Sequence, residues 1–273
     1  MAIIVPPAPV APKPSALAPT FTETPLAAKH ICFDIETGNA DDEGIELSAR
    51  FTKAASNIKN PKTAEKNLAE KRAKLEVKAA LLDAAPIACV AFVTEAQSAV
   101  FYHQGWPWAK GMKPLKSIKG CDAPLFCLKD ERDMLVGIRE WLDKRGQPVS
   151  VLIGHNVERF DLPKLRIAYV RNHLRLPLVL QPEARDVGVE VYDTQKKFLR
   201  FFTTEKHDQP FISLEEMEAR LGLPSYKDRV SGAEVPGMVA AGKVREVLTY
   251  MWLDALSTYA GFRAMTGQYQ DRA

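Results

Sequence analysis

Residues 31–37 constrain the fold most strongly, because the apolar run Ile-Cys-Phe stops there at the acids of Asp-Ile-Glu-Thr. Such a run is typical of a strand that enters a buried sheet. Side chains alternate along a strand, so Asp34 and Glu36 point to the same face. Two carboxylates so close repel each other, and each raises the pKa of the other unless a cation lies between them. The simpler interpretation is a strand end with two solvated acids.

A second apolar run, residues 149–153, stops at a Gly-His-Asn sequence that includes Asn156. A helix is predicted after it, with Pro163 tolerated in the first turn. Asp161 then lies at the start of a helix that leaves the sheet edge. Taken alone, Asp161 is more simply explained as an acid favoured by the helix dipole. Asn156 is likewise explained as a turn former.

Residues 244–256 carry a stronger helical pattern. The apolar positions recur at three- and four-residue steps: Val244, Val247, Leu248, Met251 and Ala255. Tyr250 and Asp254 are four residues apart, so their side chains are neighbours on one helix face. Taken alone, this pair is explained by packing on a core-facing helix.

The three clusters together fit a site for two hard cations. Mg²⁺ binds carboxylate and water oxygens and takes few protein ligands per ion. Two such ions stabilise the attacking and the leaving oxygens of an in-line displacement. The site needs carboxylates from several elements and no Cys or His, and a tyrosine can orient the nucleophile. The joint pattern therefore indicates phosphodiester chemistry.

The clusters resemble the Exo I, Exo II and Exo III motifs of the DEDD 3′–5′ exonucleases, in the tyrosine (DEDDy) branch. The sequence Phe-Asp-Ile-Glu-Thr at 33–37 is similar to the first motif, and residues 154–165 are similar to the second through their Asn-x-x-x-Phe-Asp core. Tyr250-x-x-x-Asp254 is similar to the third motif and excludes the histidine branch. The resemblance covers roughly residues 29–265. It is closest to the proofreading domain of family B DNA polymerases and related stand-alone exonucleases.

This resemblance implies an α/β fold of the RNase H-like (DnaQ-like exonuclease) type. A mixed sheet would be flanked by helices, with a helical insertion after the first strand. Residues 29–266 would form the exonuclease domain, and residues 267–273 a C-terminal tail.

The resemblance also implies roles for individual residues. It assigns the ligands of two Mg²⁺ or Mn²⁺ ions to four acids: Asp34, Glu36, Asp161 and Asp254. Tyr250 completes the catalytic set by hydrogen-bonding the attacking water. Backbone groups of Thr37 and Gly38 would approach the terminal nucleotide, and Asn156 and Phe160 would support the unpaired 3′ end.

The implied activity is hydrolysis of single-stranded DNA 3′ ends to nucleoside monophosphates in DNA repair, replication or proofreading. Because the chain ends nineteen residues after Asp254, we expect a free-standing enzyme that acts in trans with a replication or repair protein. One alternative is the same chemistry on RNA, which depends on recognition of the 2′-hydroxyl. Another is a non-catalytic nucleic-acid-binding module on the same scaffold, although an intact set of four carboxylates and a tyrosine argues against it.

Composition sets limits on partners and location. With 46% hydrophobic and 26% charged residues, the 273-residue chain can bury a large core. Its net charge of +3 permits nucleic-acid binding without demanding it. No apolar run approaches the roughly 20 residues that a membrane helix requires, so no membrane contact is expected. The four cysteines form no zinc-binding pattern, which favours a reduced, cytoplasmic protein.

Two segments differ from the rest of the chain. Residues 1–28 are rich in Ala and Pro and are expected to form a disordered tail. Residues 48–83 are predicted as the helical insertion, with Thr63 as a helix N-cap. Its leucines recur at seven-residue steps: Leu68, Leu75 and Leu82. The many lysines here favour either a solvated helix face or an arm that contacts DNA phosphates.

The remaining elements are predicted from apolar runs and helical spacing. In chain order they are strand 87–93, strand 99–103, a helix starting at Asp130, strand 189–192 and helix 195–202. Asp193 is predicted to cap the last of these helices, with a metal role as the alternative. Residues 221–239, rich in Gly and Pro, are predicted to form a loop before the third motif.

Loop residues offer further candidates for nucleic-acid contact. Trp106 and Trp108 flank a proline, where tryptophans either stack on a base or pack on their own domain. Lys227 and Arg229 either engage phosphate or are simply exposed.

Overall fold

The computed structural model describes residues 29–53, 58–108, 113–144, 149–182, 188–203, 211–225 and 230–268. The predicted tail at 1–28 and the basic pair Lys227 and Arg229 lie outside these residues, as does most of the C-terminal tail. None of the described helices is long and apolar enough to span a membrane.

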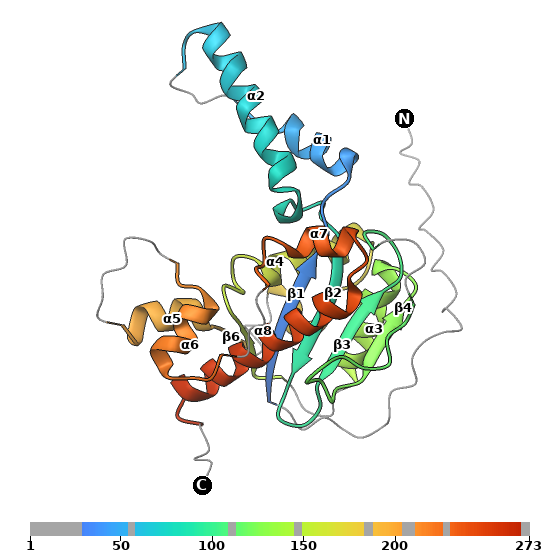
Figure 1. Cartoon of the computed structure of the whole chain (residues 1–273), viewed down its shortest axis with the longest axis vertical. Helices are drawn as coiled ribbons and strands as arrows, with labels where there is room; N and C mark the ends of the chain where they lie inside the picture. Colours follow the sequence, from blue (N-terminus) through green and yellow to red (C-terminus); the bar gives the residue numbers. More distant parts are fainter. Residues whose placement is uncertain are drawn as a thin grey trace, which may run out of the picture.

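A six-stranded mixed sheet lies at the centre of the molecule, in the order β4-β3-β2-β1-β5-β6 (Figure 1). The strands are β1 (His30–Thr37), β2 (Ile87–Val93), β3 (Ala99–His103), β4 (Leu125–Leu128), β5 (Val151–Gly154) and β6 (Glu190–Asp193). β2 is antiparallel to both β1 and β3, and the other three neighbouring pairs are parallel. The α/β class and the strands predicted at 87–93 and 99–103 are confirmed. β4 was not predicted, since four half-buried residues carry little periodic signal.

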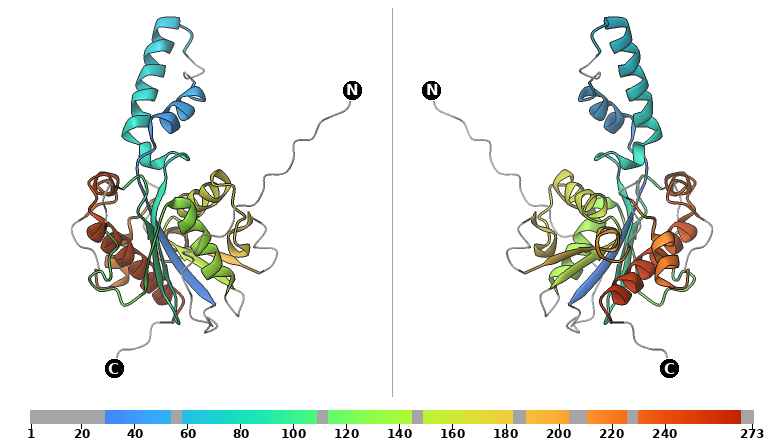
Figure 2. Two further views of the ribbon diagram at one scale, coloured as in Figure 1. Left: turned by 90° about the vertical axis from the view of Figure 1, so that its right-hand side faces the viewer. Right: turned by 90° about the vertical axis from the view of Figure 1, so that its left-hand side faces the viewer.

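Helices cover both faces of the sheet. They are α1 (Asp42–Arg50), α2 (Pro61–Val77), α3 (Glu131–Asp143), α4 (Asp161–Arg171), α5 (Thr194–Phe201), α6 (Leu214–Leu221), α7 (Val235–Ala240) and α8 (Val244–Met265), with 3₁₀ turns η1 (Ala79–Leu81) and η2 (Leu178–Leu180). Seen along the sheet, α7 and α8 lie on one side, and α3 and α4 lie on the other (Figure 2). This layering creates two apolar cores, one on each face of the central strands.

Alternation along β1 and β2 divides their side chains between the two cores. Phe33 and Phe92 face α3, where the ring of Phe92 lies 5.0 Å from that of Trp141. Cys32 faces α8 and donates its thiol hydrogen to the Ala255 carbonyl at 3.4 Å. The predicted apolar stripe of α8 is buried in this second core, so the interpretation of Val244, Val247, Leu248, Met251 and Ala255 as core residues is confirmed.

The insertion forms a helical hairpin of α1 and α2 that projects from the end of the sheet at which β1 finishes (Figures 1 and 2). Three details of its prediction are wrong. Thr63 is not the N-cap, because the Asn60 side chain accepts from the Lys62 and Thr63 amides at 3.0 and 3.4 Å. The hairpin also starts before residue 48, since the Asp41 side chain caps α1 by accepting from the Gly44 amide at 2.9 Å. The helix ends at Val77, so the last predicted leucine lies outside it.

The segment before the third motif also differs from its prediction. Residues 221–239 were expected to form a loop, yet α7 begins at Val235. Pro236 is compatible with this start, because the first turn of a helix does not need its amide hydrogens. α6 was not predicted, although Ser213 and Glu216 have the spacing of a capping box and the Glu216 amide donates to Ser213 Oγ at 3.1 Å.

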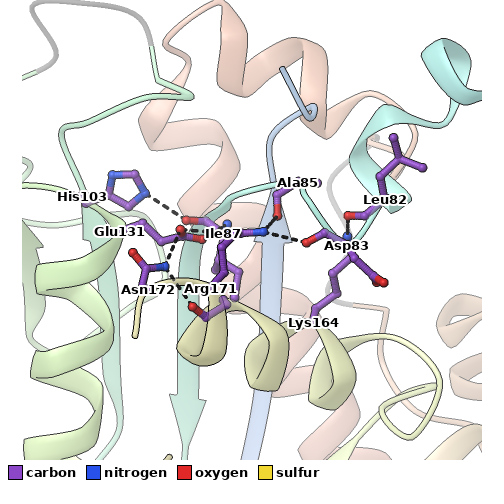
Figure 3. A network of polar contacts seen from close by, with 10 residues as sticks. Leu82, Asp83, Ala85, Ile87, His103, Glu131, Lys164, Arg171 and Asn172 are labelled. Atoms are coloured by element: carbon purple, nitrogen blue, oxygen red, sulfur yellow. Dashed lines mark hydrogen bonds and ion pairs between the residues drawn. The ribbon is translucent and has the colours of Figure 1, made fainter. Parts of the chain in front are cut away.

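A polar network fastens the returning end of the hairpin to the body (Figure 3). The Glu131 carboxylate accepts from the Ile87 amide at 2.8 Å, from Arg171 Nη2 at 2.8 Å and from Asn172 Nδ2 at 3.0 Å. Arg171 Nη1 also donates to the Asp83 carbonyl at 2.6 Å. Lys164 Nζ, in α4, donates to the Leu82 carbonyl. The hairpin is therefore anchored to the helix that carries Asp161.

We expect Glu131→Ala to lower the free energy of unfolding by about 3 kcal/mol. The Glu131 side chain is only 14% exposed, and its loss leaves Arg171 Nη2 and the Ile87 amide without the acceptor that they share. Urea denaturation measures the change. Glu65→Ala, on the exposed surface of α2, is the matched control and should differ from the wild type by less than about 0.5 kcal/mol. Equal stability of the two variants would contradict the anchoring role of Glu131.

Candidate active site

Asp34 and Glu36 lie on the central strand, just beyond the end of its pairing with β5. The last residue pair between β1 and β5 is Cys32 with Ile153. On its other side β1 remains paired with β2 through both acids, and a bulge follows Glu36. At the two carboxylates, β1 therefore has a strand neighbour on one side only among the described strands.

Asp161 occupies the side of β1 that β5 has left. It is the first residue of α4, and its side chain is 4% exposed. Its Oδ1 accepts a hydrogen bond from the Ile35 amide, between Asp34 and Glu36, at 3.4 Å. A side chain distant in sequence thus takes the place of a strand partner next to the first motif.

α8 brings Tyr250 and Asp254 to the same place. The Cys32–Ala255 contact fixes the helix against β1 directly after Asp254. Burial raises the pKa of Tyr250 well above its ordinary value, and the negative charges of Asp254 and Glu36 raise it further. The Tyr250 hydroxyl also donates a hydrogen bond to the Asp254 carboxylate. Tyr250 therefore stays protonated and lies within electrostatic range of acids from β1.

The electrostatics of Asp161 connect it to the other helices. Burial raises the pKa of its carboxyl to about 7, and the charges of Asp193 and Asp254 contribute in the same direction. The pKa of the buried Cys32 thiol is raised by burial and then by the charges of Asp34 and Asp161. The structure thus brings all five residues of the predicted catalytic set to one end of the sheet.

The donor set suits a hard divalent cation. All four acids offer carboxylate oxygens, the ligands that Mg²⁺ and Mn²⁺ prefer. A cation would favour the charged carboxylate of Asp161, whose pKa is raised mainly by burial and further by the charges of Asp193 and Asp254. Among the residues that the structure describes, no three Asp, Glu, His or Cys side chains already form a metal-binding group.

Thr37 and Gly38, predicted to approach substrate, make contacts with the base of the hairpin. The Thr37 hydroxyl donates to the Ala80 carbonyl at 3.1 Å, and the Gly38 amide donates to the Pro86 carbonyl at 3.0 Å. A Cβ on Gly38 would lie 2.2 Å from Pro107 Cγ, so only glycine fits this position without a shift. These two donors hold the hairpin, and the substrate role of the two residues stays a prediction.

Asn156 and Phe160 lie in the loop between β5 and α4. Asn156 has a φ of +59°, in the left-handed region that asparagine tolerates better than most residues. The backbone amides of Asn156 and Glu158 each donate to the Asp193 carboxylate at 3.2 Å. Phe160 is half-buried and packs on the core. The support of a 3′ end by Asn156 and Phe160 stays a prediction.

Asp193 has a structural role that the sequence only half predicted. Its Oδ1 accepts from the Lys196 amide at 3.1 Å, so the predicted cap of α5 is confirmed. The same carboxylate also holds the loop that leads to Asp161, because it accepts a hydrogen bond from the backbone amide of Asn156. This second role had no sequence signal, because it depends on β5 and β6 lying side by side.

Other residues near the site were also missed. A cavity of about 220 Å³ is lined by Tyr250 and Asp254 together with Lys119, Arg245 and Thr249. Arg245 and Thr249 lie on α8 with Tyr250, whereas Lys119 reaches the cavity from the loop before β4. The two loop tryptophans differ in burial. Trp108 is buried and its indole N–H donates to the Ala88 carbonyl at 3.3 Å, whereas Trp106 is 54% exposed.

No protein-family model matches this chain, and no curated protein is similar enough to it to count as a relative. The geometry of the site is therefore the basis for assigning a function.

Proposed function

We propose that the protein is a metal-dependent 3′–5′ exonuclease of the DEDDy type, with an RNase H-like fold, that acts on single-stranded DNA ends. The observation that carries the proposal is the meeting of Asp34, Glu36, Asp161, Tyr250 and Asp254 at one end of the central sheet. The mixed sheet with helices on both faces is compatible with that fold.

In this proposal the acids bind the metal ions and Tyr250 positions the nucleophile. Asp34, Glu36, Asp161 and Asp254 would hold two Mg²⁺ or Mn²⁺ ions, which when bound stabilise the attacking and leaving oxygens. Tyr250, kept protonated, would orient the water that attacks the terminal phosphorus. The bond to the 3′ oxygen breaks, and a nucleoside monophosphate is released.

A labelled-oligonucleotide assay tests the proposal. Single-stranded DNA with a 5′ fluorophore is incubated with the protein and Mg²⁺ or Mn²⁺, and the products are separated by length. We expect a ladder of shortened DNA that disappears with excess EDTA and returns when Mg²⁺ is restored. Parallel incubation of an RNA of the same sequence distinguishes the exoribonuclease alternative. DNA binding without shortening under any of these metals would refute the enzyme and favour the non-catalytic module.

We expect Tyr250→Phe to lower kcat on single-stranded DNA by about 100-fold. The phenyl ring preserves the packing of α8, but the hydroxyl that orients the attacking water is lost. KM should change little, because the hydroxyl does not anchor the DNA. Tyr259→Phe, at the other tyrosine of α8, is the matched control and should retain activity. Equal kcat for both variants would exclude a role for the Tyr250 hydroxyl.

A further inference from the structure

A groove lined by basic and aromatic side chains, together with the acids Glu158, Glu190 and Asp193, runs along α5 beside the loop that follows β5. It consists of two adjoining hollows with volumes of about 310 and 510 Å³. The first begins at Asn156 and Arg159, and the second ends at Phe201. Both are lined by Asp193, Lys196 and Arg200, so they form one continuous path.

The cations of the groove are available to a ligand. Arg159, Lys196 and Arg200 are exposed. Lys196 lies 2.9 Å from Glu158 and Lys197 lies 3.3 Å from Glu190, at solvent-exposed positions. Exposed ion pairs of this kind contribute about 0–1 kcal/mol, so a phosphate can replace the carboxylate at little cost.

The far end of the groove carries exposed aromatic rings. Phe201 is 61% exposed, and the neighbouring Phe202 is also exposed. The guanidinium of Arg200 lies 5.0 Å from the centre of the Phe201 ring. Cations beside exposed rings form the combination that single-stranded nucleic acids bind, since phosphates pair with the cations and bases stack on the rings.

The near end of the groove lies at the loop that leads to Asp161. The Asp193 carboxylate, which lines the groove, holds the Asn156 amide at 3.2 Å. Its charge also reaches Asp161 in the active site. α5 has 8 residues and so extends about 12 Å along the groove.

We propose that the groove from Asn156 to Phe201 holds the nucleotides upstream of the 3′ end of a single-stranded DNA. Arg159, Lys196 and Arg200 contact its phosphates, and Phe201 stacks on a base. The inference rests on the proposed exonuclease function for its direction, since it takes the active-site end as the position of the terminal nucleotide.

The test compares long and short oligonucleotides. The variants are Arg159→Ala, Arg200→Ala and Phe201→Ala, and the matched controls outside both the groove and the hairpin are Arg175→Ala, at an exposed cation, and Leu178→Ala, at an apolar side chain that is 54% exposed. Affinity for fluorescein-labelled (dT)12 and (dT)2 is measured in EDTA by anisotropy across a range of salt concentrations. Values of kcat and KM are then measured on both lengths with Mg²⁺.

Phe201→Ala should weaken binding of (dT)12 by about 5- to 150-fold. Each arginine substitution should weaken it too and reduce the slope of log K against log salt by about 0.7. Binding of (dT)2, kcat on either length and the behaviour of both controls should stay unchanged, because the groove lies outside the reacting centre.

Unchanged (dT)12 affinity in all three variants would overturn the groove assignment, even if the wild type shortens DNA. The groove assignment would also fail if wild-type protein bound a poly-glutamate peptide through Arg200 and did not bind (dT)12. If the wild type never shortens DNA but the variants still lose (dT)12 affinity, the groove stands as a binding surface and the exonuclease proposal fails.

Discussion

Asp34→Asn and Asp254→Asn are each expected to lower kcat/KM on single-stranded DNA by more than about 100-fold. Substitutions of groups that only support a metal ligand already cost 10- to 100-fold, and a direct ligand should cost more. Asparagine keeps the size of the side chain and one oxygen but removes the negative charge that attracts a cation. In Asp254→Asn this oxygen can still accept from Tyr250, so the contact between α8 and β1 should persist.

The loss should depend on the concentration of metal. A weakened ligand set raises the Mg²⁺ concentration needed for half-maximal activity, so excess Mg²⁺ should restore part of the rate in these two variants. Activity is measured against Mg²⁺ concentration, and circular dichroism checks that the fold is intact. Glu215→Gln, an exposed acid on α6, is the control and should follow the wild type. Wild-type activity in Asp34→Asn or Asp254→Asn would disprove their assignment as ligands.

Asp161→Asn is expected to abolish DNA shortening and yet stabilise the metal-free protein at pH 8. The carboxyl of Asp161 has a pKa of about 7 in the folded chain against 3.8 in a solvated reference, mainly because it is buried. At a pH between these two pKa values, the folded state holds a proton that the unfolded state has lost, so the free energy of unfolding falls as pH rises. Well above pH 7 the buried carboxyl is ionised, and the full loss in the free energy of unfolding is present. A shift of this size corresponds to on the order of 4 kcal/mol.

Asparagine carries no charge and keeps an oxygen that can accept from the Ile35 amide. The gain from Asp161→Asn should therefore be small at pH 4 and largest at pH 8. Urea unfolding in EDTA at pH 4, 6 and 8 measures it. Adding Mg²⁺ at pH 8 should stabilise the wild type by about 2.7 kcal/mol at 100 times the dissociation constant, and the variant much less. A variant less stable than the wild type at pH 8 would contradict the assigned burial and repulsion.

Local sequence signals were sufficient for most of the elements near the site. The apolar stripe of α8 has a helical period, and β2 is a short, continuous apolar run of the length typical of a buried strand. The caps of α1 and α6 were also present in the sequence, at Asp41 and Ser213, but these helices are short and weakly apolar. β4 had no such signal, because a half-buried strand of four residues is defined by its pairing with β3.

The sequence by itself determined which side chains are available for chemistry and which strand or helix carries each of them, since spacing along one element is a local property. Only the tertiary structure decided that Asp161 occupies the side of β1 beyond β5, that Asp193 holds the loop before it, and that Thr37 anchors the hairpin. These contacts join residues far apart in the chain. They form because two apolar cores fix the helices against the sheet, and no local spacing encodes that packing.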